Sequence, residues 1–115
     1  MVSADLTRFL DKRYTALGDA LLNTAATLHA VSMGEPRSIR VRNSVLSQAV
    51  KSLGLVRVGR HDTHKLADLY EGLVGYAYLR GKVKLEDLEE DISSDPGYAR
   101  LLEHVLSELQ GESED

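Results

Sequence analysis

Apolar residues recur at steps of three and four along most of the chain, the spacing that places side chains on one face of an α-helix. The first such run predicts one long helix from Ser3, its N-cap, to about Ser32. Residues 33–42 contain Gly34 and Pro36 and have too little periodicity for a helix. The pattern therefore predicts a helical start followed by a connecting loop.

Four further helices are expected downstream of this loop. Gly54 and Gly81 tolerate the left-handed conformation common at helix ends, and Asp95 followed by Pro96 is a typical helix start. The alternating segment 55–59 has no second strand to pair with and is expected to be an extended connector. The expected helices cover residues 43–53, 62–80, 85–92 and 95–111. The prediction is an all-α single domain of about five helices over residues 1–111, with an acidic tail at 112–115.

Two glycines interrupt the apolar face of the helix expected over residues 62–80. Gly72 and Gly75 lie three residues apart, and each costs about 1 kcal/mol relative to alanine inside a helix. Such residues are useful where another backbone comes close. We therefore predict that a second helix crosses this one at the two glycines.

Composition excludes several classes of protein. Hydrophobic residues make up 43% and charged residues 28% of the chain, which is typical of a globular domain. No apolar run reaches the roughly 18 residues needed to span a bilayer, and the first ten residues carry Asp5 and Arg8 where a signal peptide would be apolar. We expect a cytoplasmic protein without membrane contact. The absence of cysteine excludes thiolate chemistry, so oxygen or imidazole must hold any metal.

Three acidic residues lie among apolar neighbours. Asp19 falls in the middle of the first amphipathic run, and Asp68 and Glu71 lie three apart, on one face of a later helix. Several ionised carboxylates at an interior site repel one another, and a divalent cation such as Mg²⁺ or Mn²⁺ offsets that repulsion. The alternative is an ion-paired or partly solvated arrangement, for which the nearby Lys65 is a plausible partner. Spacing alone leaves both interpretations open.

Basic residues concentrate in one stretch of a chain whose net charge is −4. No acidic residue occurs between Glu35 and Asp62. A run of this kind is either a solvated face or a surface for a polyanion. Its members are Arg37, Arg40, Arg42, Lys51, Arg57 and Arg60.

Three segments resemble the catalytic domain of the ribonuclease III family. The sequence ALGDALL at 16–22 resembles the signature helix of that family, and ADLYEGLVGYAYL at 67–79 resembles its acidic helix. The segment VRNSVLSQA at 41–49, continuing through LGL at 53–55, is similar to the helix between them. The resemblance extends over roughly residues 10–88. It is nearest to compact archaeal members and, more distantly, to the bacterial mini-ribonuclease III group, which lack a double-stranded RNA-binding domain.

This resemblance implies a Mg²⁺-dependent endoribonuclease that hydrolyses double-stranded RNA, with Mn²⁺ as an alternative ion and no organic cofactor. Matched by position, Asp19, Asp68 and Glu71 become the metal-binding catalytic carboxylates. The family also implies a homodimer formed largely by the signature helix. The expected contacts to RNA phosphates are Arg37, Arg40, Arg42, Arg57 and Arg60, with Lys51 as a further candidate.

Two positions depart from the family pattern. Longer members carry glutamates one and two turns before the signature aspartate, where this chain has Thr15 and Lys12. Thr15 could orient a metal-bound water or pack, and we favour packing, with its hydroxyl bound to the preceding turn. Lys12 on the same face could compete with a cation. The alternative function is therefore a catalytically weak or inactive dimer that binds structured RNA or a protein partner. A plain helical interaction module, in which the acids are surface charges, ranks third.

Overall fold

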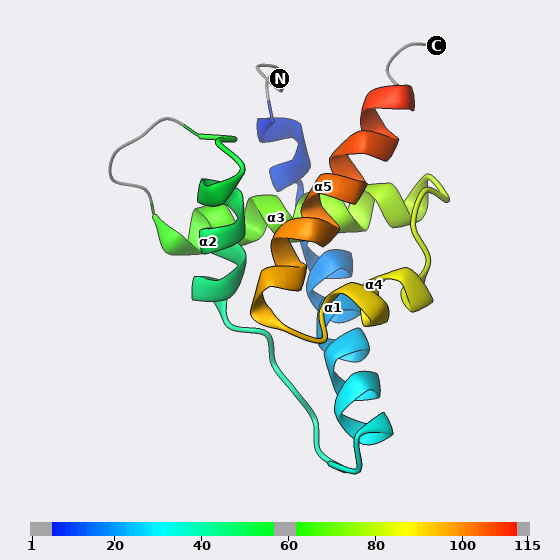
Figure 1. Ribbon diagram of the computed structural model, residues 1–115. Helices are drawn as coiled ribbons and strands as arrows, with labels where there is room; N and C mark the ends of the chain where they lie inside the picture. Colours follow the sequence, from blue (N-terminus) through cyan, green and yellow to red (C-terminus); the bar gives the residue numbers. More distant parts are fainter. Residues whose placement is uncertain (1–5, 57–61, 113–115) are drawn as a thin grey trace.

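The computed structural model describes residues 6–56 and 62–112, and these residues form helices and loops without a strand (Figure 1). A short 3-10 helix precedes five α-helices. The elements are η1 (Thr7–Leu10), α1 (Lys12–Ser32), α2 (Asn43–Ser52), α3 (Thr63–Leu79), α4 (Leu85–Asp91) and α5 (Asp95–Glu112). The predicted all-α class is confirmed. Ser3, the expected N-cap, and most of the connector at 55–59 lie outside the described residues.

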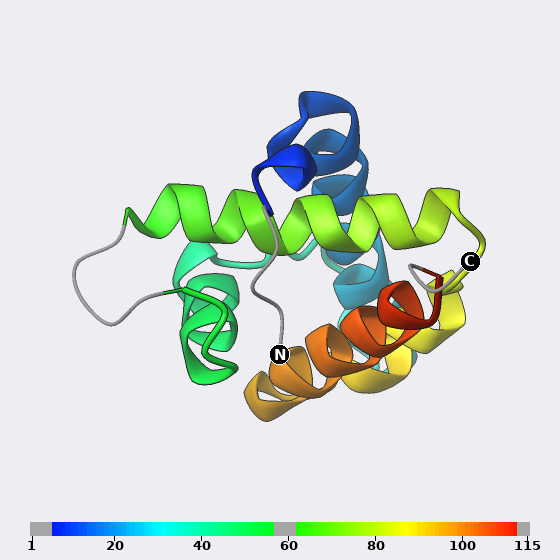
Figure 2. The same cartoon turned by 90° about the horizontal axis from the view of Figure 1, so that it is seen from above.

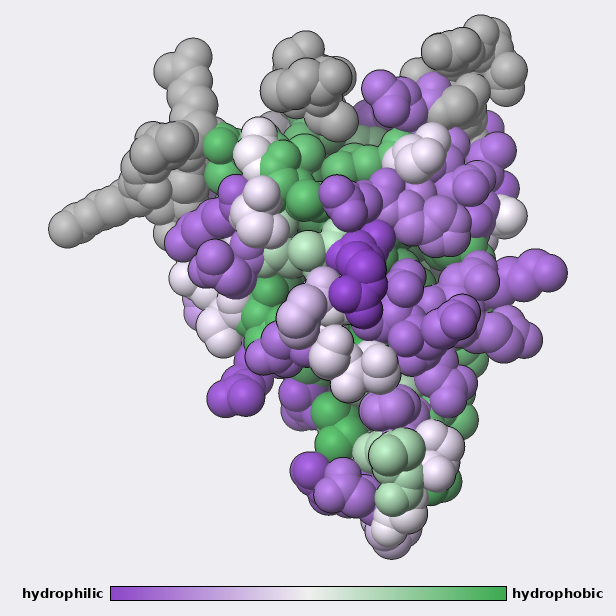
Figure 3. Space-filling model, in the orientation of Figure 1, coloured by the Kyte–Doolittle hydropathy of each residue, from purple (hydrophilic) through white to green (hydrophobic). Residues whose placement is uncertain are grey.

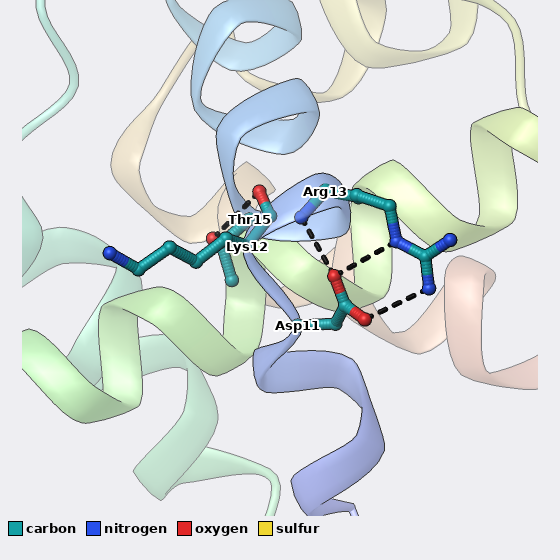
Figure 4. A network of polar contacts seen from close by, with 4 residues as sticks. All are labelled: Asp11, Lys12, Arg13 and Thr15. Carbon is teal, nitrogen blue, oxygen red and sulfur yellow. Dashed lines mark hydrogen bonds and ion pairs between the residues drawn. The ribbon is translucent and has the colours of Figure 1, made fainter.

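The prediction of one continuous helix up to Ser32 was wrong at its start. Asp11 has an extended conformation, with ψ 132°, which separates η1 from α1. Its carboxylate accepts a hydrogen bond from the Arg13 N–H at 2.8 Å and so caps α1. Figure 4 shows the same carboxylate paired with the Arg13 guanidinium. The backbone of Asp11 therefore interrupts the helical run and its carboxylate caps the new helix, although apolar residues continue on both sides.

The other helix ends lie close to the predicted positions. Gly54 and Gly81 adopt positive φ angles of 69° and 73°, which fits their expected role after α2 and α3. The Asp62 carboxylate accepts a hydrogen bond from the His64 N–H at 2.8 Å and caps α3. Helix α5 extends to Glu112, one residue past the expected end.

Helix α3 is the central element of the domain. Figure 2 shows it running across the width of the molecule with α1 crossing it, and it also packs against η1, α2 and α5. Leu73, Val74 and Ala77 are fully buried along its length. Tyr70 is also fully buried and donates a hydrogen bond from its hydroxyl to the carbonyl oxygen of Tyr98 in α5, at 2.6 Å. Apolar burial around α3 therefore holds the domain together.

Glycines allow α1 to lie directly on α3. A Cβ at Gly18 would overlap the carbonyl oxygen of Glu71, and one at Gly75 would overlap the carbonyl oxygen of Tyr14. A Cβ at Gly72 would overlap the backbone of Phe9 in η1. The predicted close approach at Gly72 and Gly75 is confirmed, and it involves η1 as well as α1. This contact fixes the position of Asp19, the neighbour of Gly18, relative to Glu71.

The outer surface is mixed in character. In Figure 3 hydrophilic side chains cover much of the side where α4 and α5 lie, and hydrophobic residues are visible between α2 and α5. Leu28, Val31 and Met33, at the C-terminal end of α1, are 41%, 53% and 69% exposed. Within the two described ranges, none of the helices combines the length and hydropathy required to cross a bilayer.

Candidate functional site

The three acidic residues predicted from sequence gather where α1 crosses α3. Asp19 follows Gly18 on α1, and Gly18 lies against the backbone of Glu71 on α3. Asp68 lies one turn before Glu71. Glu71 is only 8% exposed, Asp19 is half-buried and Asp68 is exposed, so the cluster extends from the core to the surface. The charges of Asp19 and Asp68 both act on Glu71.

Glu71 has a strongly perturbed ionisation. Burial raises its pKa from 4.5 to about 8, and a hydrogen bond with Asp19 and the negative charges of Asp19 and Asp68 act in the same direction. The guanidinium of Arg40 lowers the pKa by a smaller amount. At neutral pH the Glu71 carboxyl therefore keeps its proton and donates it in a hydrogen bond to the Asp19 carboxylate. In this form the proton relieves the repulsion between neighbouring acids.

The cluster fits a divalent cation by its chemistry, since carboxylate oxygens are the ligands that Mg²⁺ and Mn²⁺ prefer. A cation would also offset the repulsion that raises the pKa of Glu71. Among residues 6–56 and 62–112, however, no group of three acidic, histidine or cysteine side chains is arranged to hold a metal. Glu71 is hydrogen-bonded to Asp19, whereas Asp68 acts on it through charge. The metal-binding role of the three carboxylates stays a prediction.

Thr15 and Lys12 occupy the turns of α1 before Asp19. The Thr15 hydroxyl donates a hydrogen bond to the carbonyl oxygen of Lys12 at 3.4 Å, which supports the interpretation of Thr15 as a packing residue (Figure 4). The Lys12 side chain is exposed and extends away from the Asp11–Arg13 pair. Neither residue supplies a carboxylate to the cluster of Asp19, Asp68 and Glu71.

Two polar residues of α1 were not identified from the sequence. Asn23 donates a hydrogen bond from Nδ2 to Oδ1 of Asp19 at 3.2 Å, and its Oδ1 accepts one from the Val41 N–H at 2.7 Å. The Thr27 hydroxyl oxygen accepts a hydrogen bond from the Ile39 N–H at 2.9 Å. Asn23 and Thr27 follow Asp19 at steps of four, which places all three along one side of the helix. That spacing was the only sequence signal for their role.

The described part of the basic stretch lies on the loop between α1 and α2 and on α2, and one of its residues reaches the acidic cluster with its charge. Arg37, Arg40 and Arg42 are exposed on the loop between α1 and α2, and the charge of Arg40 acts on Glu71. Arg37 forms an exposed ion pair with Glu35 at 3.7 Å, a type of contact that contributes little to stability. Lys51 is exposed near the C-terminal end of α2. Arg57 and Arg60, the other predicted RNA contacts, lie outside the described residues.

The fold and site together define a helical domain with a partly buried acidic cluster at a helix crossing and a loop that brings Arg40 near it. Residues 12–105 match the family model described as Ribonuclease III. The chain belongs to the ribonuclease III family, and membership supports a nuclease acting on RNA. The matched range includes Asp19, Asp68, Glu71 and Arg40. A comparison with curated proteins gives no match.

Proposed function

We propose that this chain is a Mg²⁺-dependent endoribonuclease that hydrolyses phosphodiester bonds in double-stranded RNA, with Mn²⁺ as an alternative ion and no organic cofactor. One observation carries the proposal. The buried Glu71 carboxyl is hydrogen-bonded to Asp19 and feels the charge of Asp68, and all three residues lie within the range that matches the family. Glycines hold the two helices that carry them in close contact. Asp19, Asp68 and Glu71 would hold the cation. A cytoplasmic location remains our expectation.

The residues of the site divide the chemistry among them. A bound divalent cation would neutralise charge on the phosphate and lower the pKa of an attacking water. Glu71 must lose its proton before it can act as a ligand, and Arg40 is near enough to ease that loss by lowering its pKa. Asp19 is held by the Asn23 amide on α1, and Asp68 is exposed to solvent, where a substrate could reach it.

Duplex RNA would be bound through its phosphates. Arg37, Arg40 and Arg42 are exposed on the loop between α1 and α2, the charge of Arg40 acts on Glu71, and Arg57 and Arg60 extend the basic stretch in the sequence. Duplex RNA is recognised mainly by its shape and by contacts to its phosphates and 2′-hydroxyls, which suits a surface of arginines. Because the whole chain carries a charge of −4, attraction for RNA must come from this local surface rather than from the net charge.

The outer face of α1 supports the proposal of a homodimer. Ala16 and Ala20 are exposed, and Leu28 and Val31, nearer the C-terminal end of the helix, are 41% and 53% exposed. Exposed small and apolar residues of this kind offer a surface for a second copy of the chain. A dimer through α1 would bring together two acidic sites, one on each copy. Its test is the molar mass in solution.

A specific observation favours the alternative function. The turns before Asp19 carry a threonine bound to the helix backbone and an exposed lysine, where longer family members have glutamates. A site with fewer carboxylates binds a cation less strongly. The alternative is therefore a catalytically weak or inactive dimer that binds structured RNA or a protein partner through the same surfaces.

Cleavage of a labelled RNA duplex and of its two single strands tests the proposal. Wild type is compared with Glu71→Gln, which keeps the shape of the side chain and removes its ability to ionise and so to bind a cation as a carboxylate. Glu90→Gln, an exposed position on α4, is the matched control. We expect wild type and the control to cut the duplex, but not the single strands, when metal is present. Glu71→Gln, and any of the proteins in chelator, should not cut it. A folded wild type that binds duplex but leaves it intact would favour the alternative.

A further inference from the structure

We propose that Asn23 and Thr27 are positioning residues that clamp the loop before α2 along α1, and that Arg40, held between the two clamped residues, contacts a substrate phosphate beside the acidic cluster. This inference rests on the proposed function, since it specifies how the same site binds the RNA backbone. It assigns a role to two residues of α1 that are not acidic and to one arginine among several in the basic stretch.

The two clamping bonds fall on alternate residues of the loop. Thr27 accepts from the Ile39 N–H at 2.9 Å, and Asn23 accepts from the Val41 N–H at 2.7 Å. Ile39 and Val41 are also half-buried and pack against the core, whereas Arg40 between them is exposed. Both the backbone and the neighbouring side chains therefore fix the segment, and the Arg40 side chain is left exposed to solvent.

Asn23 connects this loop to the acidic cluster. Its Nδ2 donates to Asp19 and its Oδ1 accepts from Val41, so both ends of the amide are used. Aspartate could not replace it, because a carboxylate would face Asp19 without a proton to donate. Leucine has a similar size but forms neither bond. The side chain requirement is therefore specific for an amide.

Arg40 lies close enough to the cluster for its positive charge to act on Glu71. A guanidinium at the edge of a carboxylate cluster can bind a phosphate oxygen while a cation on the carboxylates binds another. Thr15 and Lys12 replace the glutamates of longer family members, so fewer negative charges oppose an approaching phosphate here. A phosphate that enters between Arg40 and the carboxylates would lie where hydrolysis requires it.

Amide hydrogen exchange tests the clamp without any need for activity. In wild type the Ile39 and Val41 amides should be protected. Thr27→Val, which removes one acceptor and keeps the branched shape, should accelerate exchange at Ile39 by about tenfold or more, and Thr27→Ser should restore protection. Ser107→Ala, an exposed position on α5, is the control and should leave both amides unchanged. Unchanged exchange in folded Thr27→Val would overturn the clamp.

Duplex binding and cleavage test the role of Arg40. In chelator, Arg40→Gln should weaken duplex affinity by about tenfold, and Thr27→Val should weaken it by a smaller factor. Because Thr27 acts through Arg40, the double variant should lose no more affinity than Arg40→Gln alone. Additive losses, or an Arg40→Gln variant with wild-type affinity, would overturn the proposal. If wild type binds duplex in this pattern yet never cuts it, the proposed nuclease function fails and the phosphate-binding role of Arg40 stands.

Discussion

Replacing Glu71 by glutamine should make the domain more stable at alkaline pH. The raised pKa of Glu71 means that the folded state holds this proton more strongly than the unfolded chain does. The stability that this proton contributes is therefore fully present below the ordinary value of 4.5 and is lost as the pH rises toward about 8, where the buried carboxyl ionises. Glutamine keeps a neutral donor at this position at every pH, so the variant avoids that loss.

The size of the effect follows from the shift in pKa. A shift of one pKa unit corresponds to about 1.4 kcal/mol of folding free energy. The rise in the pKa of Glu71 from 4.5 to about 8 therefore limits the stability lost at alkaline pH to about 5 kcal/mol. Relaxation of Asp19 and entry of water near the exposed Asp68 reduce this loss. We therefore expect the free energy of unfolding of Glu71→Gln to exceed that of wild type by about 2–4 kcal/mol at pH 9. Near pH 4.5 the unfolding free energies of the two proteins should differ by less than about 1 kcal/mol.

Urea unfolding at a series of pH values, in chelator, measures this difference directly. Asp68→Asn is the matched control, since it neutralises an exposed member of the cluster and should produce a smaller change. A gap between wild type and Glu71→Gln that stays constant from pH 4.5 to 9 would refute the reasoning, because the destabilisation would then not come from ionisation of Glu71.

Three further predictions concern the helix crossing, the core and the basic loop. Gly18→Ala should destabilise the domain by about 2 kcal/mol or more in urea unfolding, since its methyl group would overlap the backbone of α3; an unchanged midpoint would contradict the close contact. Tyr70→Phe should cost about 1–2 kcal/mol by the same measurement, because the carbonyl of Tyr98 loses its buried donor. Charge reversal of Arg40 and Arg42 should lower duplex affinity and flatten its salt dependence in binding titrations, and an unchanged slope would exclude them as phosphate contacts.

The sequence was sufficient for most of the helices and for the meeting of two acidic residues at the helix crossing. Apolar spacing indicated α2 to α5 within one or two residues, and Gly72 and Gly75 indicated a close crossing by their position inside an otherwise apolar helix. The residues singled out as acids among apolar neighbours, Asp19 and Glu71, do meet at that crossing. These features were predictable because each depends on a repeating pattern or on a residue type with few other uses.

The features that were missed depend on single hydrogen bonds. Asp11 ends one helix and caps the next through its own side chain, and periodicity contains no information on such a cap. Asn23 and Thr27 bind loop residues 18 and 12 positions further along the chain. In sequence they are ordinary polar residues of an amphipathic helix, and only the folded arrangement shows which backbone groups they meet.

Titration of the folded protein with Mn²⁺ at pH 8.5, followed by calorimetry, tests the central claim that the carboxylates at the helix crossing hold a divalent cation. The account predicts saturable binding by wild type that is lost or greatly weakened in Asp19→Asn and in Glu71→Gln and is kept in Glu90→Gln. Equal binding by all four proteins, or no binding by wild type, would contradict it.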